Sequence, residues 1–124
     1  MIFVDTNVVM YAVGRAHPLK EPARQFFAEA LADRTRLCTS AEVLQELLHA
    51  YLPVGRFEVF EAAIALLERM SVEVRPLERD DVAAAGALRA QYPALGARDL
   101  CHLASCRRRG VSEIKTFDQA LASV

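Results

Sequence analysis

The sequence lacks the features that mark several large classes of protein. No stretch approaches the roughly 18 consecutive apolar residues that are needed to cross a bilayer, which argues against membrane insertion. The opening residues, MIFVDTN, have neither the basic nor the apolar segment of a secretory signal, so we expect a cytoplasmic protein. There is no internal repeat, linker or low-complexity segment. Residues 1–124 are therefore predicted to form one domain, large enough to fold without disulfides.

The sequence has few cysteines and almost no net charge. Cys38, Cys101 and Cys106 cannot all pair within one chain, and none forms the C-x-x-C pair of a zinc or redox site. We expect buried free thiols. The net charge is only −1, so the molecule as a whole gives no electrostatic argument for binding nucleic acid. Any such surface must come from where the charges are placed.

Short apolar segments alternate with amphipathic ones along the chain. The pattern predicts strands at 1–4, 36–39, 72–74 and 113–117. It predicts helices at 8–13, 20–32, 40–52, 57–70, 78–92 and 98–109, with a final helical turn. Because parallel strands need long crossover connections, this alternation indicates an α/β fold with a parallel sheet and helices on both faces.

Polar residues follow the first strand directly, as Asp5-Thr6-Asn7. Sites in such folds lie at the carboxyl ends of the strands, above all where the strand order reverses. If the first and fourth strands are neighbours, Asp5 and Asp118 face each other across a crevice, and Thr116 accompanies Asp118. The alternative is that Asp5 or Thr6 only caps the following helix.

The helix after the second strand offers two glutamates. With Thr39 as the N-cap, Glu42 would complete a capping box and satisfy backbone N–H groups. Glu46 has no such duty and lies one turn further on the same face, so it is the better candidate for the crevice. The alternative for Glu46 is a solvated surface acid.

Two more polar residues belong to the helix that starts near residue 98. Taken alone, Asp99 would be a cap or a partner of the helix dipole, but with the other three acids we favour a site role. His102 could share its face, although a single histidine among apolar residues is more typical of a packed side chain. The acidic cluster Glu78, Asp80 and Asp81 is predicted to be structural, because acids are favoured in the first turn of a helix.

Four converging carboxylates would repel one another and raise some of their pKa values unless a cation neutralised them. An all-oxygen ligand set points to Mg²⁺ or Mn²⁺ rather than zinc. Such an ion can activate water for hydrolysis of a phosphodiester. The residues therefore predict metal-dependent hydrolysis of a phosphodiester.

Four segments carry a resemblance to a known family: Val4-Asp5-Thr6-Asn7, Ser40 to Leu47 with Glu46, Ala97-Arg98-Asp99 running into Leu103-Ala104, and Lys115-Thr116-Phe117-Asp118. In this order they cover almost the whole chain, which resembles PIN-domain proteins and, among them, VapC-type toxins of toxin–antitoxin pairs. The resemblance implies a three-layer α/β fold with a short parallel sheet of four or five strands. The last strand is in doubt, because the sequence ends soon after Asp118.

The resemblance also implies an activity and a division of roles. It implies a metal-dependent endoribonuclease whose catalytic and metal-binding acids are Asp5, Glu46, Asp99 and Asp118, with Glu46 bound to the metal directly or through water. Thr6 and Asn7 would brace the loop around Asp5, and Thr116 could bond a metal water or a phosphate. RNA products would carry a 5′-phosphate and a 3′-hydroxyl. The implied partners are a second copy of the chain and a VapB-like antitoxin whose C-terminal segment covers the crevice.

RNA must be held by positive groups beside this acidic centre. Arg98 is the best-placed candidate, and Arg15 and Lys20 are further ones. The arginines at 107–109 lie at the far end of the same helix, about 16 Å away, so they cannot act on the same phosphate. These arginines either bind other phosphates of the RNA backbone or only stabilise the C-terminal end of their helix, where cations are favoured.

Three other functions stay open from the sequence. A housekeeping PIN nuclease of RNA processing would carry the same acids as a toxin. A catalytically silent interaction module would keep the fold alone. A phosphatase of the haloacid-dehalogenase type would use Asp5 as a nucleophile, but it would carry a second Asp where this chain has Asn7.

Overall fold

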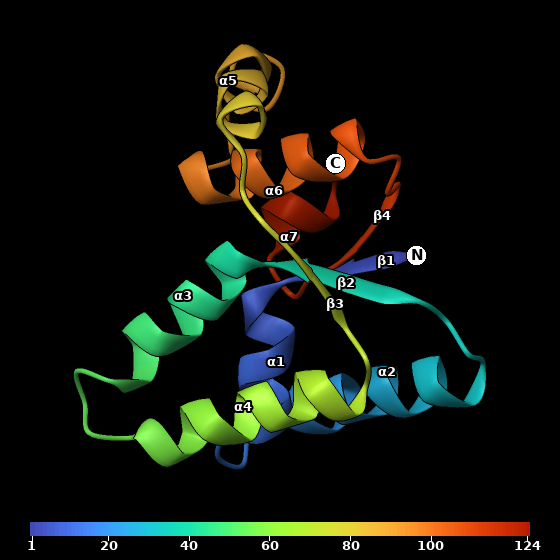
Figure 1. Ribbon diagram of the computed structural model, residues 1–124, viewed down its shortest axis with the longest axis vertical. Helices are drawn as coiled ribbons and strands as arrows, with labels where there is room; N and C mark the ends of the chain where they lie inside the picture. The colour runs from blue at the N-terminus through green and yellow to red at the C-terminus, as the bar shows by residue number, and fades with distance from the viewer.

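Strands and helices alternate throughout the computed structural model, which describes all of residues 1–124 (Figure 1). The strands are β1 (Ile2–Val4), β2 (Leu37–Ser40), β3 (Glu73–Arg75) and β4 (Glu113–Lys115). The helices are α1 (Thr6–Val13), α2 (Lys20–Ala32), α3 (Ala41–Tyr51), α4 (Phe57–Arg69), α5 (Arg79–Leu88), α6 (Ala97–Arg108) and α7 (Gln119–Ala122). Every predicted element is present, and none of the helices is long and apolar enough to span a bilayer.

The sheet is fully parallel, with the strand order β3-β2-β1-β4. β1 pairs with β2 on one side and with β4 on the other. Phe3 of β1 lies opposite Cys38 of β2 and opposite Ile114 of β4. The strand order therefore reverses between β1 and β4, and the predicted neighbour relation of these two strands is confirmed. The sheet has four strands, because the chain after β4 turns into the short helix α7 instead of a fifth strand.

Helices α1 to α4 cover one face of the sheet, and α5 to α7 lie on the other (Figure 1). The larger core lies on the first face, where Val8, Phe27 and Leu47 pack against β1 and β2. A smaller core around Leu103 and Leu121 fills the second face. The predicted three-layer α/β fold is confirmed, and so are the three buried free cysteines.

The start of α3 differs from the prediction by one residue. β2 extends through Ser40, whose hydroxyl accepts a hydrogen bond from Val43 N at 3.2 Å and caps the helix. Thr39 instead donates its hydroxyl to Val4 O at 2.8 Å and joins β2 to the carboxyl end of β1. The predicted capping box of Thr39 and Glu42 is therefore wrong, because the helix register places Glu42 one position too early.

A capping box does occur at α5, where Glu78 and Asp81 satisfy each other's backbone N–H groups. Asp81 is fully buried and accepts from Arg108 Nη1 at 2.5 Å and Arg109 Nη1 at 2.9 Å, which clamps α5 to the end of α6. Burial raises the pKa of Asp81, but hydrogen bonds from Arg109, from Glu78 N and from Arg108 lower it overall. The acidic cluster is structural, as predicted, and these two arginines serve the fold.

Candidate active site

The four predicted acids lie around one cleft at the carboxyl end of the sheet. Each comes from a different place in the chain: the end of β1, the second turn of α3, the first turn of α6, and the residue before α7. The cleft has a volume of about 570 Å³, and its polar lining includes Asp5, Thr6, Asn7, Glu46, Arg98, Asp99 and Asp118. The structure thus brings together segments that are up to 113 residues apart in the sequence, from Asp5 to Asp118.

Asp5 is both a helix cap and a wall of the cleft. Its side chain is 5% exposed, and its Oδ1 accepts a hydrogen bond from Thr6 N at 2.8 Å at the start of α1. Its Oδ2 accepts from the Thr116 hydroxyl at 2.7 Å. Asp5 therefore caps α1 and also lines the cleft, and capping fixes the orientation of its carboxylate.

Asn7 and Thr116 tie the loop after β1 to the loop after β4. Asn7 Oδ1 accepts from Phe117 N at 3.1 Å, and Asn7 Nδ2 donates to Thr116 Oγ1 at 3.2 Å. Thr116 Oγ1 also accepts from Asp118 N at 3.0 Å. Because the one hydroxyl proton of Thr116 goes to Asp5, this residue orients two acids rather than offering a donor to a ligand. Asp118 Oδ1 in turn caps α7.

Glu46 is held from one side and left open on the other. Thr6 donates its hydroxyl to Glu46 Oε2, while Glu46 Oε1 is buried without any hydrogen-bond partner. Burial raises the pKa of Glu46, but the neighbouring His102 and Thr6 lower it overall, so the carboxylate form is favoured. An ionised, buried oxygen without a partner is costly in a folded protein and marks a place where a cation fits.

His102 joins the acids, which the sequence did not reveal. It is 2% exposed and packs on Phe3 with ring centroids 5.0 Å apart, as a core histidine would. Its Nε2 also lies 3.5 Å from Glu46 Oε1 and 3.9 Å from Asp5 Oδ1. Burial lowers the pKa of His102, but Glu46 and Asp5 raise it overall. The only signal in the sequence was the three-residue spacing from Asp99. A histidine that merely packs in the core can have the same spacing.

The donor set fits a divalent cation. One ligand atom from each of Asp5, Glu46 and His102 lies within 4.8 Å of the others. Burial raises the pKa of Asp99, and the like charges of Asp5 and Asp118 raise it further. A cation would remove that repulsion and satisfy Glu46 Oε1.

The predicted cationic residues do not all reach the cleft. Arg98 lines it, and its charge contributes to the lowered pKa of Glu46. Arg15 lines a neighbouring cavity instead. Lys20 lines a different cavity, and its Nζ donates to Gly14 O at 2.7 Å.

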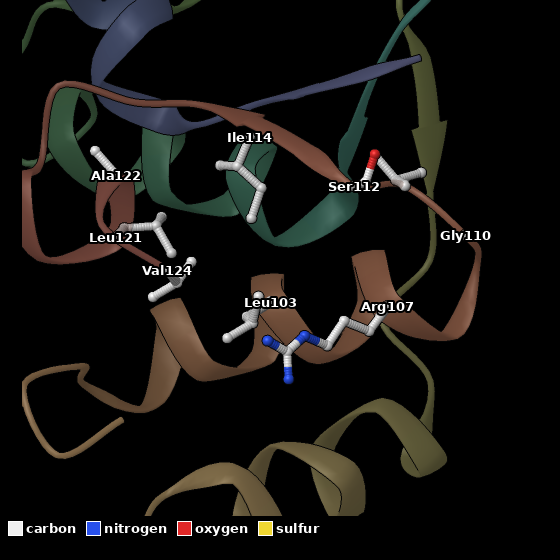
Figure 2. A pocket seen from close by; sticks show the side chains of 9 residues that line it. Leu103, Arg107, Gly110, Ser112, Ile114, Leu121, Ala122 and Val124 are labelled. Atoms are coloured by element: carbon white, nitrogen blue, oxygen red, sulfur yellow. The ribbon is translucent and has the colours of Figure 1, made fainter. Parts of the chain in front are cut away.

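A separate cavity of about 370 Å³ lies between α6, β4 and α7 (Figure 2). Leu103, Ile114 and Leu121 give it an apolar wall, and Arg107 lies at its edge. Its lining contains none of the four acids and no other acidic side chain. The chemistry that the sequence predicts therefore belongs to the acidic cleft alone.

Residues 2–124 match the family described as PIN domain. The chain belongs to the PIN-domain family. This PIN domain is 58% identical over 123 residues to Ribonuclease VapC23 of Mycobacterium tuberculosis, covering 99% of this chain and 97% of that protein. It is 38% identical to Ribonuclease VapC13 of the same species, covering 99% and 94%.

Solved structures share the fold at low sequence identity. Mycobacterium tuberculosis VapC20, described as a sarcin-ricin loop cleaving toxin, superposes with a TM-score of 0.80 at 20% identity, covering 99% of this chain and 94% of that one. A toxin–antitoxin complex from Klebsiella pneumoniae gives a TM-score of 0.68 at 18% identity, with 100% and 92% coverage. These likenesses agree with the PIN-domain fold described above.

Proposed function

We propose that this PIN-domain protein is a metal-dependent endoribonuclease and the toxin of a toxin–antitoxin pair. The observation that carries the proposal is the buried Oε1 of Glu46, which makes no hydrogen bond in a cleft lined by four carboxylates. The high identity to Ribonuclease VapC23 over nearly the full length of both proteins supports RNA as the substrate. The products carry a 5′-phosphate and a 3′-hydroxyl.

Asp5 and Glu46, whose ligand oxygens lie within 4.8 Å of each other, would hold Mg²⁺ or Mn²⁺ together with Asp99 and Asp118 from the same cleft, because oxygen ligands suit these ions. When bound, the cation supplies charge neutralisation and activates water for hydrolysis of the phosphodiester. Thr6 and Thr116 hold the carboxylate of Asp5 in place, and Asn7 braces the two loops.

The remaining side chains of the cleft position Glu46 and the RNA. His102 faces Glu46 Oε1 and orients this carboxylate, while Thr6 fixes its other oxygen. Arg98, on the rim of the same cleft, binds a phosphate of the RNA backbone. A covalent aspartyl mechanism is disfavoured, because the amide of Asn7 is committed to Thr116 and Phe117.

The proposed partners are a second copy of the chain and a VapB-like antitoxin whose C-terminal segment covers the acidic cleft. Support for the antitoxin comes from the solved relatives, which include a toxin–antitoxin complex from Klebsiella pneumoniae and VapBC2 from Rickettsia felis. A cytoplasmic location follows from the RNA substrate.

The activity is tested with purified protein, Mn²⁺ and single-stranded RNA. Asp5→Asn, Asp99→Asn and Asp118→Asn are expected to lower kcat/KM by about a hundredfold or more, because each removes a charged group that acts directly on the reaction. Glu61→Gln, an exposed change on α4, is the matched control and should cleave as the wild type does. Full activity of Asp99→Asn would contradict the site.

A stability measurement shows that the loss is not one of folding. The folded-state pKa of Asp99 is raised, so its ionised form destabilises the metal-free protein at neutral pH. In EDTA, Asp99→Asn should therefore melt at or above the wild-type temperature, and the difference should vanish below about pH 4. Mn²⁺ should raise the melting temperature of the wild type more than that of the variant.

A further inference from the structure

A second cavity, of about 320 Å³, adjoins the acidic cleft. The two share Asn7 and Met10 as wall residues. Beyond this shared wall the second cavity is lined by Tyr11, Gly14, Arg15, Ala16, His17, Tyr51 and Arg56. None of these residues is acidic, so the cavity offers aromatic and cationic groups directly beside a centre of negative charge.

One face of α1 and the loop after it connects the two spaces. Asn7, Met10 and Tyr11 follow the spacing that puts side chains on a single face of α1, and Gly14 caps the C-terminal end of that helix. Tyr11 is one turn beyond Asn7, a rise of about 6 Å along the helix axis. An RNA strand with its scissile phosphate at the acids can therefore place an adjacent nucleotide in this cavity.

The aromatic surface is already arranged in the protein. The rings of Tyr11 and His17 lie 4.6 Å apart at an interplanar angle of 33°, and Phe117 supports Tyr11 edge-on at 5.7 Å. His17 is exposed, and its Nδ1 accepts a hydrogen bond from Leu19 N at 3.0 Å, which fixes the ring plane. A base that stacks here meets a surface that needs no ordering.

The cations suit a nucleic-acid backbone. Arg15 is exposed beside His17, and the guanidinium carbon of Arg56 lies 5.9 Å from the ring centroid of the buried Tyr51. Single-stranded RNA is recognised by aromatic stacking of unpaired bases combined with cationic contacts to phosphates. The cavity supplies both kinds of group within one wall of the active site.

We propose that this cavity is a base-binding subsite that selects where the RNA is cut. The base of a nucleotide next to the scissile phosphate stacks on the Tyr11–His17 pair, and Arg15 and Arg56 bind the phosphates that flank it. The inference rests on the proposed ribonuclease function and adds to it the residues that decide sequence preference.

Two substitutions of His17 distinguish the stacking role of its ring from the role of its hydrogen bond in the turn. His17→Asn removes the ring but keeps an acceptor for Leu19 N, because asparagine side chains bond the backbone N–H two residues on. His17→Phe keeps the ring and loses the acceptor. A random-sequence single-stranded RNA pool is cleaved with Mn²⁺, and the 5′ ends are sequenced. His17→Asn should lose the preference at one position beside the cut, with kcat/KM about tenfold lower, and His17→Phe should retain both.

The arginines are tested by the salt dependence of RNA binding. Arg15→Gln and Arg56→Gln should each lower the slope of log affinity against log salt by about 0.7, the value for one phosphate contact to a single strand. Arg79→Gln on α5, whose side chain is 96% exposed, is the matched control and should leave the slope unchanged.

A measurement without cleavage keeps the subsite separate from the activity. A set of single-stranded decamers, each with the fluorescent base 2-aminopurine at a different position, is bound to the protein in the Asp99→Asn background. The fluorescence should be quenched for one label position, and His17→Asn should abolish that quenching. Absence of RNA cleavage by the wild type would overturn the proposed function, while this quenching would still report on the subsite. Equal cleavage preference and equal quenching in wild type and His17→Asn would overturn the subsite. So would equal defects in both His17 variants accompanied by lower melting temperatures, because the residue would then serve only the turn.

Discussion

His102 shows how one side chain can belong to the core and to the site at once. Its ring packs on Phe3 within the sheet, and its Nε2 faces the unpartnered oxygen of Glu46. In the metal-free protein the histidine partly compensates the buried carboxylates of Asp5 and Glu46. We therefore expect that His102 stabilises the site and that an apolar residue of similar size cannot replace it.

Replacement of His102 by leucine leaves the buried Glu46 carboxylate without a compensating group. His102→Leu should lower the free energy of unfolding in EDTA by about 1–3 kcal/mol and reduce kcat, whereas His102→Gln keeps an N–H donor and should retain more of both. Although burial lowers the pKa of His102, Glu46 and Asp5 raise it above its usual value. The stabilisation should therefore be complete below about pH 6.5 and decline as the pH rises through the folded-state pKa.

Urea denaturation across this pH range, together with steady-state cleavage, measures the effect. A His102→Leu protein that equals the wild type in stability and in kcat would show that the histidine is a packing residue alone. A drop in stability with unchanged kcat would place His102 in the fold and outside the site.

At the scale of elements, the clamp between α5 and α6 sets the position of the helix that carries Asp99 and His102. Asp81 at the start of α5 bonds Arg108 and Arg109 at the end of α6, while Asp99 and His102 lie in the earlier turns of the same helix. Asp81 is the fully buried member, so its removal takes two charge-assisted hydrogen bonds from the arginines, which keep their contacts with Glu78. Such a loss is more costly than the loss of an exposed ion pair.

Asp81→Ala is expected to lower the free energy of unfolding by roughly 3 kcal/mol at neutral pH, with Asp81→Asn intermediate. The exposed change Glu61→Ala on α4, outside the clamp, is the control and should change the free energy of unfolding by less than about 0.5 kcal/mol. Because the folded-state pKa of Asp81 is lowered, its contribution is present above about pH 4 and is lost as the pH falls through the folded-state value. Urea denaturation at pH 7 and pH 3 measures this, and an Asp81→Asn deficit that persists unchanged at pH 3 would contradict it.

At the scale of the whole molecule, a net charge of −1 conceals a strongly uneven distribution. Four acids gather in one cleft, Arg98 stands on its rim, and the arginines at 108 and 109 are used within the fold. A polyanion such as the proposed RNA substrate would need cations beside this acidic cleft, and Arg98 is the one that lines it.

Arg98→Gln should weaken RNA binding and lower the slope of log affinity against log salt by about 0.7. The melting temperature should stay unchanged, because Arg98 is exposed at the start of α6. Titration of RNA at several salt concentrations in the Asp99→Asn background measures the slope without cleavage. An unchanged slope would show that Arg98 does not contact the backbone.

The sequence by itself determined the alternation of strands and helices, the three-layer fold and the four acids of the cleft. These features depend on interactions within a few residues: the apolar period of an element, the caps at its ends and the polar residues that follow a strand. The local rules reach their limit even here, since the cap of α3 is Ser40 and not Thr39.

Only the tertiary structure decided which of these residues meet. The pairing of β1 with β4 brings Asp5 to Thr116 and Asp118, and the packing of α6 on the sheet brings His102 to Glu46. Partners tens of residues apart are chosen by the strand order and by the packing of helices, which no short stretch of sequence encodes. For the same reason the free oxygen of Glu46 and the aromatic cavity beside the acids became visible only in the folded chain.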